Sequence, residues 1–196
     1  MIPQRLIRTV PEKTSGEVET WWEQACLLHP DWEHVTLRDP IDRQDFPLTG
    51  PSWEGCESGA QLADLIRAEE LYLRGGVYID SDVEVLRPFD SLLGVKGFLG
   101  WEDTEHICNA VMGFEGNHFG LAVYIETALS RLKEGTWASG VGTITEVFRN
   151  RLDTLLLPPQ ALYPIHYSAK HITQEPWSTV HWCFTTHHWR HSWSKE

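Results

Sequence analysis

The sequence predicts one α/β domain over residues 1–196, with a mostly parallel central sheet flanked by helices. Three observations predict it. The chain opens with strand, helix and strand patterns in alternation, which is typical of a parallel sheet. Its 196 residues suit one domain with a sizeable core, and 41% hydrophobic with 22% charged residues is ordinary for a globular protein. No internal repeat, low-complexity stretch or linker divides the sequence.

The first part of the chain supplies the opening strand–helix–strand unit. Residues 5–10 predict a strand that ends at Pro11. Apolar residues at helical spacing then predict a helix over 17–28, and residues 34–37 predict a second strand. Residues 38–59 are rich in Asp, Pro, Gly and Ser, so we expect a long connection there, and such connections are often functional loops.

The middle of the chain continues the alternation. Residues 60–74 predict a helix, and the glycines at 75–76 are a good C-terminal stop. Residues 77–79 then predict a strand, and residues 82–86 continue in an extended pattern.

The second half of the chain is less regular. We expect strands at 97–101 and 110–114 and helices over 120–132 and 144–152. From residue 155 onward prolines, histidines and aromatic residues follow one another without clear periodicity.

Net charge limits the partners. The formal charge of −12 and the pI near 5.2 disfavour a nucleic-acid partner, because tracking phosphates requires a basic surface. An acidic protein can still bind an anionic small molecule when a metal ion supplies local positive charge.

Cysteine usage and hydropathy bear on location. Four cysteines lie far apart and form no CxxC pair, which is typical of free thiols in a reducing compartment: Cys26, Cys56, Cys108 and Cys183. The N-terminal residues lack an apolar leader, and no apolar run is long enough to span a bilayer. We therefore expect a cytoplasmic protein without a transmembrane segment.

Two aspartates stand where the expected strand at 77–79 leaves the core. In an extended segment, Asp80 and Asp82 point to the same side, roughly 6 to 7 Å apart. Ligands in open α/β sheets bind at the carboxyl ends of the strands. Paired carboxylates there suit Mg²⁺ or Mn²⁺ together with phosphate oxygens. The alternative is a merely solvated pair, since the pattern DxD is common.

A third aspartate lies on the helix expected before this strand. Asp64 and Arg67 are three residues apart and therefore share a helix face. The pair is either a simple helix salt bridge or presents a carboxylate to ribose hydroxyls and a guanidinium to phosphate.

These residues belong to a longer pattern. The run ADLIRAEELYLRGGVYIDSDVEVLRPFDSL, residues 63–92, resembles the core of the DXD-containing sugar-binding glycosyltransferases, family thirty-two. That family includes yeast-type mannosyltransferases and bacterial polysaccharide-modifying enzymes, and is distantly similar to toxin glucosyltransferase domains. Residues 1–10 resemble its opening strand, residues 187–193 its closing His-His-Trp-x-x-Ser-Trp element, and residues 139–148 a weakened form of its Thr-Gly-Pro loop.

The resemblance implies a GT-A fold, a Rossmann-like α/β domain. It also implies a retaining enzyme that moves a sugar from a nucleotide-sugar donor, a UDP- or GDP-sugar, to a glycan, protein or small-molecule acceptor. The implied cofactor is Mn²⁺ or Mg²⁺.

The resemblance also assigns residues to the donor site. Asp80 would contact the sugar and ribose and reach the metal directly or through water, and Asp82 would be the firm metal ligand. Asp64 and Arg67 would hold the ribose and the transferred sugar.

The C-terminal element completes the implied site. One histidine is expected on the metal or diphosphate, with His188 preferred to His187. Ser192 and Trp193 would help to close over the donor and exclude water.

Two further residues are candidates for orienting the sugars. Glu102 follows an expected strand end, and Asn109 matches a family-like Asn-Ala pair. We count both with Asp80 and Asp82 as the catalytic set, and expect front-face retention without a protein nucleophile.

Two other interpretations remain open. The segment VYIDSDVEV also resembles a phosphatase signature of the haloacid dehalogenase kind, although 79 residues precede Asp80 and no Asp-Asp pair follows. Ten tryptophans are also compatible with a non-catalytic carbohydrate-binding module.

Overall fold

A computed structural model describes residues 1–169 and 181–190. Six strands form the main sheet, in the order β2-β1-β3-β6-β5-β7. Their bounds are Arg5–Val10 (β1), Glu33–Arg38 (β2), Gly76–Ile79 (β3), Gly97–Trp101 (β5), Ile107–Phe114 (β6) and Leu155–Leu157 (β7). Only β6 pairs antiparallel with its neighbours, β3 and β5. The predicted mostly parallel sheet is confirmed, and its single-domain extent over 1–196 stays a prediction.

The described part of the chain also contains five α-helices. They are α1 (Gly16–Leu28), α2 (Gly59–Arg74), α3 (Phe119–Ser130), α4 (Thr143–Phe148) and α5 (Pro159–Leu162). Serine side chains cap the two longest helices: Ser15 accepts from the amide of Val18, and Ser58 accepts from the amide of Gln61. Helix α2 ends at Arg74 and is capped by Gly75, which adopts a φ of 68° that glycine reaches at little energetic cost.

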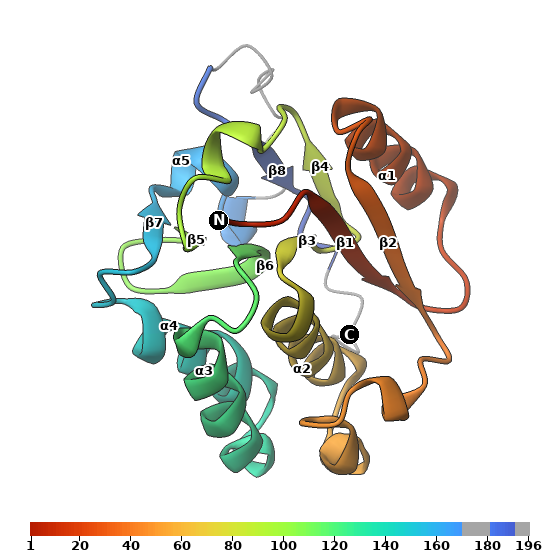
Figure 1. Cartoon of the computed structure of the whole chain (residues 1–196), viewed down its shortest axis with the longest axis vertical. Helices are drawn as coiled ribbons and strands as arrows, with labels where there is room; N and C mark the ends of the chain where they lie inside the picture. Colours follow the sequence, from red (N-terminus) through yellow and green to blue (C-terminus); the bar gives the residue numbers. More distant parts are fainter. Residues whose placement is uncertain (170–180, 191–196) are drawn as a thin grey trace.

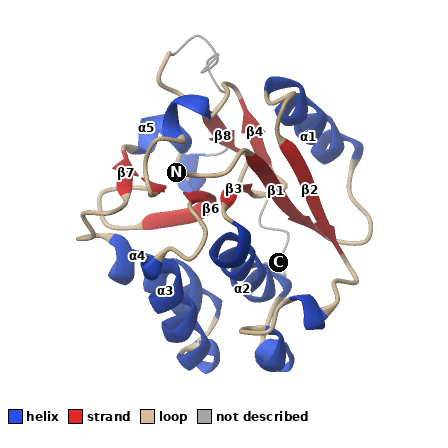
Figure 2. Cartoon of the chain, in the orientation of Figure 1, coloured by secondary structure: helices blue, strands red, loops and turns tan. Residues whose placement is uncertain are grey.

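Each face of the sheet packs its own core. Neighbouring strand residues point to opposite faces, so Val77 joins one core and Tyr78 the other. The face that holds Tyr78 packs against α2, α3 and α4, which lie together in Figure 1. The opposite face packs against α1, α5 and strand β4 (Val83–Val85). Figure 2 shows the resulting arrangement of helices around the strands.

Strand β4 is not part of the main sheet. It pairs antiparallel with β8 (Thr185–His187), so the two form a small separate sheet. The predicted extended run over residues 82–86 is wrong at its start, because residues 80–83 form a turn in which the Val83 amide donates to the Asp80 carbonyl (3.0 Å). This turn directs the chain out of the sheet.

The long connection after β2 is ordered by α2. It contains two short 3₁₀ helices, η1 (Arg43–Asp45) and η2 (Gly50–Gly55). Buried Glu69 of α2 accepts hydrogen bonds from the amides of Leu48 and Thr49 at 2.8 Å each. The connection is therefore anchored to the helix that carries Asp64 and Arg67.

The last third of the described chain departs most from the sequence prediction. Helix α4 ends at Phe148 instead of Leu152, and β7, α5 and β8 were not predicted. All four cysteines are free, as predicted. Among the described residues, no helix combines the length and apolar character needed to cross a membrane.

Candidate active site

The acidic pair lies at the carboxyl edge of the main sheet. Asp80 directly follows β3, and Asp82 is held two residues on by the turn. Ligand atoms of Asp80, Asp82 and His187 all lie within 4.8 Å of one another. The carboxylates thus meet as predicted, although a turn and not an extended strand brings them together.

The strand β8 and the residues after it hold Asp82. Nε2 of His187 lies 3.1 Å from one carboxylate oxygen, and the backbone amide of Arg190 donates to the other at 2.9 Å. Trp189, between them, has a φ of 50°, a left-handed conformation that turns the Arg190 amide back toward Asp82. Burial raises the pKa of Asp82, but these contacts outweigh burial and hold its pKa at about 2.

The two adjacent histidines differ in their position relative to the acidic pair. His187, and not His188, shares the cluster with the acidic pair. Successive residues of an extended chain point to opposite sides, so the ring of His188 turns away. It lies 3.1 Å from Glu84 and stacks on Trp21 with 4.1 Å between the ring centroids.

Arg67 is the centre of the buried part of the site. Its guanidinium lies 2.9 Å from Asp80 and 3.3 Å from Asp64. It also donates to the backbone carbonyls of Ala63 (3.2 Å) and Asn109 (2.8 Å). With four protein acceptors and 5% side-chain exposure, Arg67 holds the carboxylates in place, and its predicted contact with the donor stays a prediction.

The two carboxylates beside Arg67 have raised pKa values. Burial raises the pKa of Asp64 to about 6, against the lowering influence of Arg67 and the hydrogen bond from Asn109. Burial likewise raises the pKa of Asp80, against Arg67. The hydroxyl of Tyr78 donates to Asp80 at 2.8 Å and lies 2.7 Å from Thr9.

The antiparallel strand β6 explains how Asn109 reaches the site. Because β6 runs against β3 and β5, its first residues lie at the carboxyl ends of those strands. The side-chain amide of Asn109 donates to Asp64 at 2.9 Å. Glu102 directly follows β5 and therefore lies at the same edge of the sheet.

Glu102 has a partner that the sequence did not suggest. Nε2 of His166 lies 3.6 Å from its carboxylate. Burial raises the pKa of Glu102, against the lowering influence of His166 and the smaller one of His187. His166 comes from the segment after α5, where no periodicity or motif distinguishes it from the other histidines of the tail.

The weakened Thr-Gly-Pro loop also reaches the site. A Cβ atom added to Gly140 would collide with the carboxylate of Asp64, so the backbone passes directly over that side chain. This close approach requires glycine and places residues 138–142 (η5) as one wall of the Asp64 region. The predicted donor contacts Ser192 and Trp193 lie outside the described residues.

The cluster of Asp80, Asp82 and His187 has the chemistry of a cation site. Two carboxylates supply the hard oxygen ligands that divalent cations prefer. Nε2 of His187, 3.1 Å from Asp82, adds an imidazole nitrogen beside these oxygens, and imidazole nitrogen is a common metal ligand. The residues present therefore fit a divalent metal ion.

Comparison with known proteins agrees with this geometry. Residues 11–99 match the family described as "Glycosyltransferase sugar-binding region containing DXD motif". The chain is therefore similar to this family over residues 11–99. The matched range contains Asp64, Arg67, Asp80 and Asp82, and it favours the glycosyltransferase interpretation over the phosphatase alternative.

Relatives and solved structures extend the comparison. Inositol phosphoceramide mannosyltransferase 3 of Schizosaccharomyces pombe is 32% identical over 114 residues, which are 56% of this chain and 31% of the relative. Mouse lactosylceramide 4-alpha-galactosyltransferase is 26% identical over 82% of this chain and 49% of the relative. The chain thus spans about a third of the first relative and half of the second.

Among solved structures, the PaToxG glycosyltransferase superposes with a TM-score of 0.65 at 15% identity, covering 77% of this chain and 70% of its own. This structural similarity confirms the expected GT-A fold.

Proposed function

We propose that the protein is a metal-dependent, retaining glycosyltransferase that uses a nucleotide-sugar donor. One observation carries the proposal: two carboxylates of the DXD region and a histidine distant in sequence converge within 4.8 Å at the carboxyl edge of a GT-A sheet. A divalent ion in this position would be held by Asp80, Asp82 and His187. The imidazole ligand favours Mn²⁺ over Mg²⁺, which prefers an all-oxygen shell.

In the transfer, the bond from the anomeric carbon to the diphosphate oxygen breaks, and a bond to an acceptor hydroxyl forms on the same face. The bound metal supplies positive charge against the charge that develops on the leaving diphosphate. Arg67 holds Asp80 in position, so that the carboxylate stays directed toward the cluster. As the new bond forms, the proton of the acceptor hydroxyl passes to the leaving diphosphate oxygen, which lies on the same face.

The remaining residues would orient the sugars. Asp64 lies against the backbone at Gly140 and beside Asn109, and we assign it to hydroxyls of the donor ribose or sugar. Glu102, with His166 beside it, is assigned to hydroxyls at the acceptor side. Hydrogen bonds to several hydroxyls fix a sugar's position before reaction, which is a large part of the catalytic effect.

The acceptor class is proposed from the relatives. Both relatives are named after a ceramide lipid. We therefore place the sugar head groups of glycolipids first among the glycan acceptors to be tried.

The test is a thermal-shift panel of UDP- and GDP-sugars with Mn²⁺. The true donor is expected to raise the unfolding midpoint, because it binds only the native state, and chelation with EDTA is expected to remove the shift. The stabilising donor is then assayed for sugar release and transfer. Stabilisation without turnover would favour the carbohydrate-binding alternative, and no stabilisation by any donor would refute the proposal.

A further inference from the structure

A hollow beside helix α4 contains an exposed tryptophan. It has a volume of about 530 Å³ and is lined by Glu105, His106, Trp137, Gly142, Thr145, Glu146 and Arg149. Binding sites for small ligands typically have volumes of about 300–1,000 Å³. We propose that this hollow binds a neutral hexose unit of the acceptor glycan, a proposal that rests on the proposed transferase function.

Trp137 is the platform of the hollow. Its side chain is 61% exposed, although large aromatic side chains gain most from burial. Two neighbours fix its position: the ring of His106 meets it edge-on at 5.6 Å, and a Cβ atom at Gly142 would lie 3.0 Å from the indole. A fixed, exposed indole is suited to receive the apolar C–H face of a pyranose ring.

The polar lining suits hydroxyl groups and not phosphate. Carboxylates of Glu105 and Glu146 accept hydrogen bonds, and the guanidinium of Arg149 donates them. Arg131 lies 2.8 Å from Glu146 and orients it. Arg149 and Arg131 balance the charges of Glu105 and Glu146, so the lining has no surplus positive charge for a diphosphate and suits an uncharged, hydroxyl-rich group.

The position of the hollow relates it to the acceptor. It shares the segment 138–142 with the donor site, because Gly140 covers Asp64 and Gly142 packs on Trp137. It also shares the connection between β5 and β6, where the Glu102 amide donates to the His106 carbonyl at 2.8 Å. A glycan with one sugar in the hollow would run along these two segments toward Glu102.

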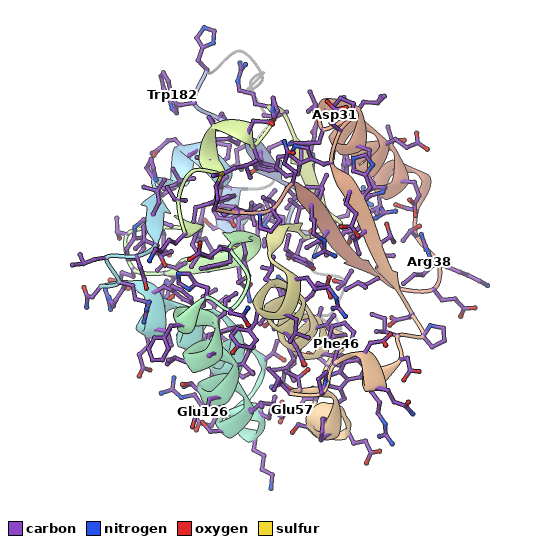
Figure 3. All side chains as sticks on the ribbon, viewed as in Figure 1. Asp31, Arg38, Phe46, Glu57, Glu126 and Trp182 are labelled. Carbon is purple, nitrogen blue, oxygen red and sulfur yellow. The ribbon has the colours of Figure 1, made fainter. Side chains whose placement is uncertain are left out.

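Binding is tested directly by nuclear magnetic resonance on ¹⁵N-labelled protein, without any donor. The probes are the methyl glycosides of mannose, galactose and glucose. The indole N–H signal of Trp137, assigned with Trp137→Phe, is expected to shift saturably with at least one glycoside. Trp182 is 63% exposed, outside the hollow and at the edge of the molecule (Figure 3), so its signal is the matched control.

Kinetics supply the second readout. Trp137→Ala is expected to raise the acceptor KM about tenfold, or about 1.4 kcal/mol, with Phe at this position retaining part of the affinity. Trp182→Ala is expected to leave KM unchanged. An unshifted Trp137 signal with all three glycosides, or an unchanged acceptor KM in Trp137→Ala, would overturn the proposal. Glycoside binding without donor turnover would instead refute the transferase function and leave the hollow as a sugar site.

Discussion

Two arginine–carboxylate clusters stand at opposite ends of strands β1 and β3, and they differ in charge balance. At the amino end, Arg5 lies 2.6 Å from Glu33 and 3.0 Å from Glu70, and donates to the carbonyl of Gly75. Arg74 pairs with Glu70 as well. Two arginines therefore face two glutamates, and the cluster ties β1, β2 and α2 together without surplus charge.

At the carboxyl end the balance is different. Within the described residues, one guanidinium, that of Arg67, forms ion pairs with both Asp64 and Asp80. Asp82 and Glu102 add further negative charge at the same edge. Raised pKa values at Asp64 and Asp80 follow from this crowding and burial. A balanced cluster stabilises the fold, whereas an excess of carboxylates indicates a place for a cation.

The largest expected effect is the loss of Arg67. Arg67→Met leaves Asp64 and Asp80 buried without their cation, so we expect a loss of about 3–5 kcal/mol in the free energy of unfolding. The measurement is urea denaturation near neutral pH. The matched variant at the balanced end is Arg5→Met, where Glu70 keeps Arg74 and Glu33 is 60% exposed.

That control sharpens the comparison between the two clusters. We expect Arg5→Met to cost about 1–2 kcal/mol, the usual value of hydrogen bonds to charged groups at a partly exposed site. Equal costs for the two variants would mean that the two ends are structurally equivalent, and the proposed functional difference would lose its physical basis.

The next effect concerns metal-dependent binding. Asp82→Asn removes a carboxylate ligand while an amide oxygen can still accept from the Arg190 amide. We expect the Mn²⁺-dependent affinity for UDP or GDP to fall at least about 100-fold, or about 2.7 kcal/mol, measured by calorimetry. Glu33→Gln, which removes a carboxylate from the balanced end, is expected to leave this affinity unchanged. Unchanged affinity in Asp82→Asn would exclude Asp82 as the firm ligand.

A pair of adjacent histidines gives a smaller and more local test. His187→Ala is expected to weaken the same Mn²⁺-dependent binding about 10- to 100-fold, the usual range for losing support around a metal site. His188→Ala removes only the contacts with Glu84 and Trp21, so binding is expected to stay within about twofold. The reverse result would restore the sequence-based preference for His188.

Local patterns explain which parts of the fold could be predicted. Helix α2, its glycine stop and strand β3 follow from periodicity and from residues within one segment. The tail lacks such periodicity, and β8 is formed only by pairing with β4, about a hundred residues earlier. The choice between His187 and His188 depends on this pairing, so a single sequence could not decide it.

The site shows the same limit. The DxD pair predicted where the acidic cluster lies, although the turn at 80–83 replaced the extended geometry from which it was inferred. The spacing of Asp64 and Arg67 predicted that they share a helix face, but not that four protein acceptors surround the guanidinium. His166 reaches Glu102 through tertiary packing alone, and no sequence signal marks it.

The smallest expected effect is a pH dependence at the unbalanced end. The pKa of Asp64 is raised from 3.8 to about 6, mainly by burial, so the folded state disfavours its ionised form. The stability associated with Asp64 is fully present below pH 3.8 and is lost as the pH rises through 6. In Asp64→Asn the side chain stays neutral at every pH, and its oxygen can still accept from Asn109.

The free energy of unfolding of the wild-type protein, minus that of Asp64→Asn, is therefore expected to fall by about 2 kcal/mol between pH 4 and pH 7. Urea denaturation in EDTA at several pH values measures this difference without contributions from bound metal. Glu33→Gln again serves as the balanced-end control. A difference that stays constant between pH 4 and pH 7 would show that Arg67 balances the charge of Asp64 fully. The excess negative charge would then lie only on Asp80, Asp82 and Glu102.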